Sequence, residues 1–78
     1  MDDLQLAYDV IYGNIMAYHR DGYLRPLNSM SDDEVMSVIY NITLDAKEQL
    51  GSTFNDEFIG QLVDKLFDNY CRVHNLYC

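Results

Sequence analysis

Three residues late in the sequence have side chains that could bind a metal ion. Cys71, His74 and Cys78 stand at i, i+3 and i+7, so a continuous helix would present a thiol, an imidazole and a thiol on one side. All are acceptable zinc ligands, but a structural site needs four, and the fourth would have to be His19 or a carboxylate from elsewhere. The paired Cys-x2-Cys motif is also missing from the sequence. We therefore expect no metal site, and interpret these residues as a buried thiol beside a helix-end histidine.

The same residues offer little for covalent catalysis. Cys71 and His74 could form a thiolate pair, but the sequence indicates no oxyanion-hole loop or third orienting group. The four glycines never cluster into a phosphate-binding loop, and the acids lack the spacing of a calcium loop. We expect a protein that is not an enzyme, with no catalytic residue, no cofactor and no small-molecule substrate. A Cys71–Cys78 disulfide would require a frayed C-terminus. In a continuous helix their α-carbons would be about 10.5 Å apart, whereas a disulfide needs less than about 7 Å.

Three segments have the three- and four-residue apolar spacing of amphipathic helices. The first is predicted at residues 2–20, before a glycine that can terminate it. The second starts at the Ser31–Glu34 capping box and ends at Gly51. The third follows residues 52–55, and its apolar positions recur as far as Tyr77, so it is expected to continue nearly to the C-terminus.

The connection at residues 21–30 contains glycine, proline, asparagine and serine, which favour turns. Tyr23, Leu24 and Leu27 are expected to pin it to the core, and residues 26–30 have room for one short helical turn. Short connections make neighbouring helices antiparallel, so the predicted fold is an all-α, small three-helix bundle in a single domain, residues 1–78. A helix-turn-helix DNA reader is an alternative arrangement, but no helix has the basic residues that it needs.

The chain has thirteen acidic and five basic residues, for a formal charge of −8. This balance argues against direct binding of nucleic acid or anionic lipid, both of which attract Lys and Arg. Seven acids fall in predicted first turns, where the helix dipole favours them. Asp64 and Asp68, at i and i+4, suggest an acidic ridge on the third helix. One alternative function is therefore an acidic mimic that blocks a nucleic-acid-binding protein.

More apolar side chains are present than one small core needs. Met36, Tyr40 and Leu44 recur at i, i+4 and i+8 on a different face from the buried stripe of the second helix. On the first helix, Tyr12 and Met16 also lie off the main stripe. Tyrosine and methionine are enriched at association surfaces. We interpret these five residues as a partner-binding surface.

The sequence thus favours a small acidic protein–protein interaction module, an inhibitor or adaptor for which phage and mobile-element proteins provide an analogy of size and charge. Its partner would be another protein or, as a further alternative, a second copy in a structural homodimer. No run approaches the roughly 18 apolar residues of a spanning helix. The start, Met1-Asp2-Asp3, lacks the basic residues of a signal peptide, so we expect a cytoplasmic protein with reduced thiols and no membrane partner.

Overall fold

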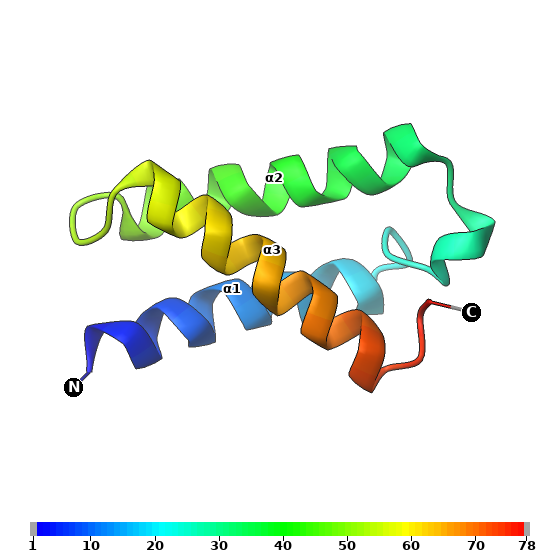
Figure 1. Ribbon diagram of the computed structural model, residues 1–78, viewed down its shortest axis with the longest axis horizontal. Helices are drawn as coiled ribbons and strands as arrows, with labels where there is room; N and C mark the ends of the chain where they lie inside the picture. The colour runs from blue at the N-terminus through cyan, green and yellow to red at the C-terminus, as the bar shows by residue number, and fades with distance from the viewer. Residues whose placement is uncertain (1, 78) are drawn as a thin grey trace.

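The computed structural model describes residues 2–77 and contains three long helices (Figure 1). Helix α1 comprises Asp3–Arg20, α2 Asp32–Leu50 and α3 Asp56–Val73, and the short 3-10 turn η1 comprises Leu27–Ser29. Each helix packs against the other two, and residues 2–77 contain no strand. The predicted three-helix bundle is confirmed, and η1 is the short turn expected at residues 26–30. Among the described residues, no helix combines the length and the apolar character needed to span a membrane.

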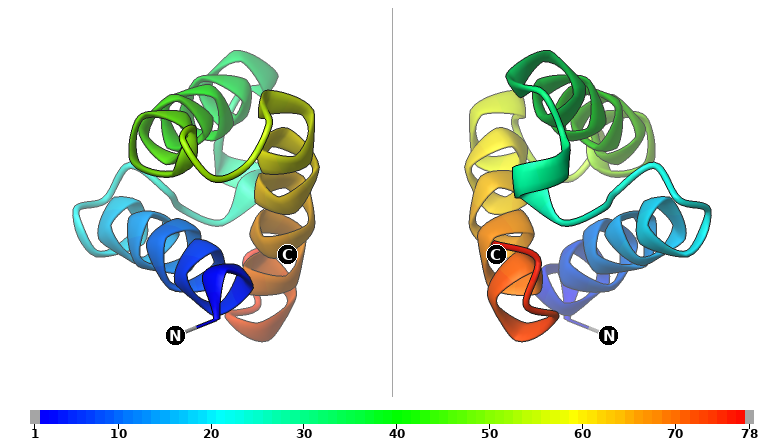
Figure 2. Two further views of the ribbon diagram at one scale, coloured as in Figure 1. Left: turned by 90° about the vertical axis from the view of Figure 1, so that its left-hand side faces the viewer. Right: turned by 90° about the vertical axis from the view of Figure 1, so that its right-hand side faces the viewer.

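Viewed end-on, the helices occupy the corners of a triangle around one core (Figure 2). Helix α3 runs obliquely across the other two (Figure 1). Apolar residues three and four positions apart put one stripe from each helix inside, as expected for amphipathic helices. The fully buried large side chains are Ile11, Ile15, Leu24, Ile42, Leu50, Ile59, Val63 and Cys71.

The helix starts are set by side chains that accept from free backbone N–H groups. The capping box of α2 is present: Ser31 Oγ accepts from the Glu34 N–H (3.2 Å), and Glu34 accepts from the Ser31 N–H (3.1 Å). The Arg25 guanidinium donates to the same carboxylate at 2.8 Å. These bonds, led by the one from the Ser31 backbone, lower the pKa of Glu34. Asn55 caps α3 by accepting from the Phe58 N–H at 2.7 Å.

The loop after α1 is turned by Gly22, which has a φ of 85°, a conformation that glycine adopts without strain. Leu24 is buried, as expected, and its N–H donates to the Tyr18 carbonyl at 3.0 Å. The expectation that Tyr23 pins the loop to the core is wrong: its side chain is 63% exposed. Its ring meets only the edge of Tyr18, with centroids 5.9 Å apart.

The predicted extension of α3 towards Tyr77 is also wrong, because the helix ends at Val73. Asn75 has a φ of 57°, in the left-handed region that asparagine tolerates and that ends helices. The chain then folds back, and the Leu76 carbonyl accepts from the Leu27 N–H at 2.7 Å. Leu76 is buried as a result, whereas Tyr77 is about half exposed.

Candidate protein-binding surface

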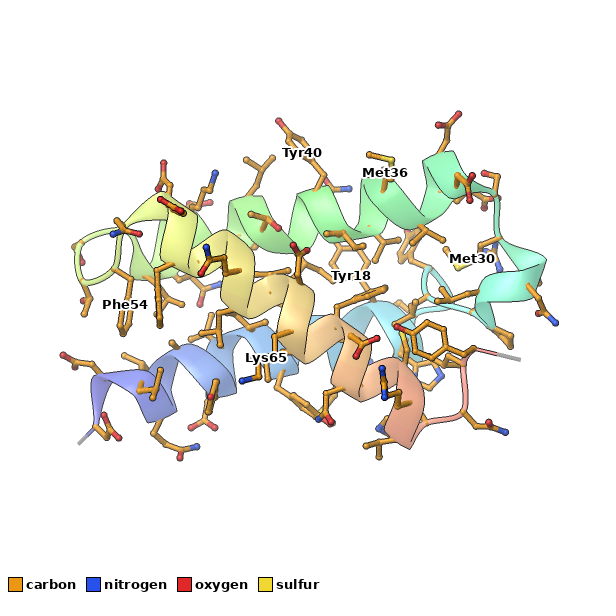
Figure 3. All side chains as sticks on the ribbon, viewed as in Figure 1. Tyr18, Met30, Met36, Tyr40, Phe54 and Lys65 are labelled. Carbon is orange, nitrogen blue, oxygen red and sulfur yellow. The ribbon has the colours of Figure 1, made fainter. Side chains whose placement is uncertain are left out.

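The outer side of α2 carries three large apolar side chains on successive turns. Met36, Tyr40 and Leu44 are 67%, 64% and 44% exposed, and we call them the α2 ridge. Figure 3 shows Met36 and Tyr40 projecting away from the other two helices. The stripe that α2 buries in the core comprises Val38, Ile42, Ala46 and Leu50. The helical spacing that faces this stripe inward leaves the ridge outside.

A shallow groove of about 360 Å³ lies beside the ridge, and we call it the α2–α3 groove. Ile39 contributes a partly buried side chain that also packs against the core. The Thr43 hydroxyl donates to the Ile39 carbonyl at 2.8 Å, so the backbone of α2 already satisfies this donor. The groove is therefore mainly apolar, with one carboxylate at its edge. Its lining residues are Met36, Ile39, Tyr40, Thr43 and Asp64.

The two predicted binding residues of α1 do not join this surface. Met16 is 53% exposed, but it lines a different groove, of about 440 Å³, between α1 and α3. Tyr12 is partly buried against the core, and its ring lies edge-on to Tyr70 with centroids 5.4 Å apart. The five residues are thus split between two sides of the triangular bundle, and Tyr12 is mostly a packing residue.

Only one of the two carboxylates in the predicted acidic ridge, Asp64 and Asp68, is free to bind a partner. Asp64 is exposed, and no hydrogen bond or ion pair joins it to another residue between 2 and 77. Asp68, by contrast, pairs with Arg72 Nε at 3.0 Å and accepts a hydrogen bond from the Tyr77 hydroxyl. That hydrogen bond is the main reason why the pKa of Tyr77 rises to about 12. The Asp64–Asp68 pair therefore presents one unpartnered carboxylate.

Sequence reasoning missed a cluster of imidazole and phenol rings between the C-terminal turns of α1 and α3, beside the groove that Met16 lines. His19 Nδ1 and Tyr70 Oη are joined by a hydrogen bond of 2.6 Å. His74 stacks on the Tyr70 ring with centroids 4.0 Å apart, and the two imidazoles lie 5.7 Å apart. Burial raises the pKa of Tyr70. His19 and Tyr70 are 51 residues apart in the sequence, so no local pattern could have paired them.

The end of α3 separates Cys71 from His74, two of the three candidate metal ligands. Cys71 is buried, and burial raises the pKa of its thiol to about 11, so it is protonated at neutral pH. His74 stands at the helix C-cap, and Cys78 lies outside the described residues. Within residues 2–77, no group of three His, Cys, Asp or Glu side chains is placed to hold a metal ion. The structure therefore offers no continuous helix to carry all three residues.

Comparison with known proteins adds no relative: no protein-family model, no curated protein and no solved structure matches this chain. The case for a function therefore depends on the exposed side chains themselves. Of the five predicted binding residues, Met36, Tyr40 and Leu44 lie together on one exposed helix face, and the α2–α3 groove lies beside them.

Proposed function

We propose that this chain is a non-enzymatic interaction module, an inhibitor or adaptor that binds another protein through the α2 ridge and the α2–α3 groove. The observation that supports it is the exposure of Met36, Tyr40 and Leu44 on successive turns beside an apolar groove. Burying one large apolar side chain contributes about 1.5–3 kcal/mol. A partner that covered all three would remove most of the apolar surface of this helix face from water.

The two alternative functions predict different surfaces. A structural homodimer would cover the same ridge with a second copy. A phosphate mimic would depend on Asp64 and Asp68, but Asp68 already pairs with Arg72, so the mimic hypothesis receives less support.

A cytoplasmic location is part of the proposal, and it is supported by the buried, unpaired thiol of Cys71. Alkylation of cells lysed directly into denaturant, which exposes the buried Cys71 thiol, would test whether both thiols are reduced in the cell.

The first test is the mass of the purified protein by light scattering, over a range of concentrations and with reductant present. A monomer is expected, because the α2 ridge is proposed to bind a different protein and not a second copy of the chain. A stable dimer that Tyr40→Ala dissociates would instead support the homodimer.

The second test is capture of partners from a lysate of the source cells on immobilised wild-type protein and variants. Tyr40→Ala and Leu44→Ala should remove the captured partner, because truncating central apolar anchors costs an interface most. Tyr23→Ala is the matched control, as Tyr23 is equally exposed (63%) but lines a different groove, with Arg25 and Glu34. Loss of capture with Asp64→Asn and Asp68→Asn, but not with Tyr40→Ala, would contradict the proposal and support the phosphate mimic.

A further inference from the structure

The charges around the α2–α3 groove are mainly negative. Asp64 is its only charged lining residue, and it has no partner among residues 2–77. Glu57 and Asp68 lie seven residues before and four residues after Asp64, on the same flank of α3, although Asp68 is paired with Arg72. The first turn of α2, next to Met36, has three further acids, of which Glu34 is paired with Arg25. An apolar surface edged by carboxylates favours a partner with apolar anchors and adjacent cations.

Basic residues that could neutralise this groove from within the chain are few. Lys47, one turn beyond Thr43, is the only basic residue of α2. On α3, Lys65 follows Asp64 directly, but it lines a groove on the α1 side with Leu4 and Phe58. Figure 3 shows Lys65 on the lower side of α3, towards α1 and opposite Tyr40. The charge of Asp64 is therefore available to a partner.

The shape of the surface fits a helix. Successive ridge residues are four positions apart, which is about 6 Å along α2. A facing helix presents anchors at i, i+4 and i+7 with similar spacing, and side-chain ridges of one helix pack into the grooves of another. The other common mode, addition of an extended strand, needs an unpaired sheet edge, and residues 2–77 form no sheet.

A second copy of the chain is a poor occupant on electrostatic grounds. Each copy has a formal charge of −8, and packing two α2 ridges together would bring their acidic edges close. Each copy would offer Lys47 as the only cation of its α2. Like charges across an interface oppose association, so the charges favour a different, basic partner.

We infer that the α2–α3 groove binds an amphipathic helix of a partner protein, with apolar anchors against Met36 and Tyr40 and a Lys or Arg side chain against Asp64. This inference rests on the proposed function and adds the chemistry of the partner. The apolar anchors provide most of the affinity, whereas the ion pair at the exposed edge contributes a smaller share and weakens with salt.

The experiment uses synthetic peptides of known sequence as probes. A labelled 18-residue peptide with leucines along one helical face and lysines beside them is titrated with the full-length protein, and binding is followed by fluorescence anisotropy. A second peptide replaces every lysine with glutamate. A third has the composition of the first in an order that is not amphipathic. Only the first peptide is expected to bind, because it alone combines an ordered apolar face with cations.

Variants of the protein then locate the binding site. Tyr40→Ala should weaken binding of the Leu/Lys peptide about tenfold or more, as for a central anchor. Asp64→Asn should weaken it about two- to fivefold, as for an exposed ion pair. Tyr23→Ala and Asp9→Asn are the matched controls; Asp9 is an exposed acid of α1 that does not line the groove, and both variants should bind like wild type. Circular dichroism verifies the fold of each variant.

Several results would overturn the inference and leave the proposed function standing. If Tyr40→Ala abolishes partner capture but the Leu/Glu peptide binds as well as the Leu/Lys peptide, the partner is not basic. Equal weakening by Asp64→Asn and Asp9→Asn would mean diffuse attraction to an acidic surface. If the third, non-amphipathic peptide binds, or if none of the three peptides binds, the occupant of the groove is not an amphipathic helix. A dimer that Tyr40→Ala dissociates would identify a second copy as the occupant.

Discussion

Helices α1 and α2 each have a tyrosine and a methionine four residues apart outside their main buried stripe, yet the two pairs end in different surroundings. Tyr12 of α1 is partly buried and meets the ring of Tyr70, whereas Tyr40 of α2 is 64% exposed. The difference comes from α3, which places a large aromatic side chain over Tyr12 and the small polar Asp64 beside Tyr40. Residue type and spacing define a helix face, and the crossing of a third helix decides whether that face is covered.

Removing the Tyr70 ring, which covers Tyr12, is expected to have the largest effect on stability. Tyr70 is buried (2% exposed) and contacts Tyr12, His19 and His74. Tyr70→Ala should lower the free energy of unfolding by about 3–5 kcal/mol, as for other large aromatic truncations in cores. Urea denaturation measures this change. A loss below 1 kcal/mol would mean that Tyr70 does not cover Tyr12 in solution.

The contribution of the Tyr70 hydroxyl can be separated from that of its ring. Tyr70→Phe keeps the ring over Tyr12 but removes the hydrogen bond to His19 Nδ1. A single hydrogen bond contributes about 1 kcal/mol net. Tyr70→Phe should therefore lower the free energy of unfolding by about that amount, far less than Tyr70→Ala. His19→Phe should then lower the free energy of unfolding by less in the Tyr70→Phe background than in the wild type, because the hydrogen bond is already absent. A double-mutant cycle measures this difference.

The start of α2, which orients the exposed ridge, should depend on pH through Glu34. Its pKa is lowered in the folded protein by the capping box and Arg25, so the stabilisation is present above the ordinary glutamate pKa and is lost as the pH falls through the folded value. The difference in melting temperature between wild type and Glu34→Gln should therefore be largest near neutral pH and shrink below about pH 4. A difference that grows on acidification would contradict this account.

The smallest effect on stability is expected at Tyr40. Because its ring is exposed and its outer face meets no other helix, Tyr40→Ala should change the free energy of unfolding by no more than about 0.5 kcal/mol. The same urea measurement as for Tyr70→Ala makes the comparison direct. A loss near that of Tyr70→Ala would show that the α2 ridge is a structural surface, buried in a dimer, and not an open site.

Features determined within one helix or one turn could be predicted from the sequence. The Ser31–Glu34 capping box and the exposure of Met36, Tyr40 and Leu44 follow from local spacing, and the structure contains both. Features that depend on contacts between distant segments could not be predicted. No periodicity shows that Tyr70 will cover Tyr12 or meet His19, and the fold-back at Asn75, which buries Leu76, interrupts an apolar pattern that resembles a longer helix.

The hydrogen bond from the Leu27 N–H to the Leu76 carbonyl joins the loop after α1 to the segment after α3. During synthesis, α1 and α2 leave the ribosome well before Leu76 does, so they can meet while this loop still lacks its anchor. The bundle can close only when almost the whole described chain has emerged. Folding of this protein should therefore be completed after translation of its third helix, and until then α1 and α2 would expose their core-facing stripes to proteases.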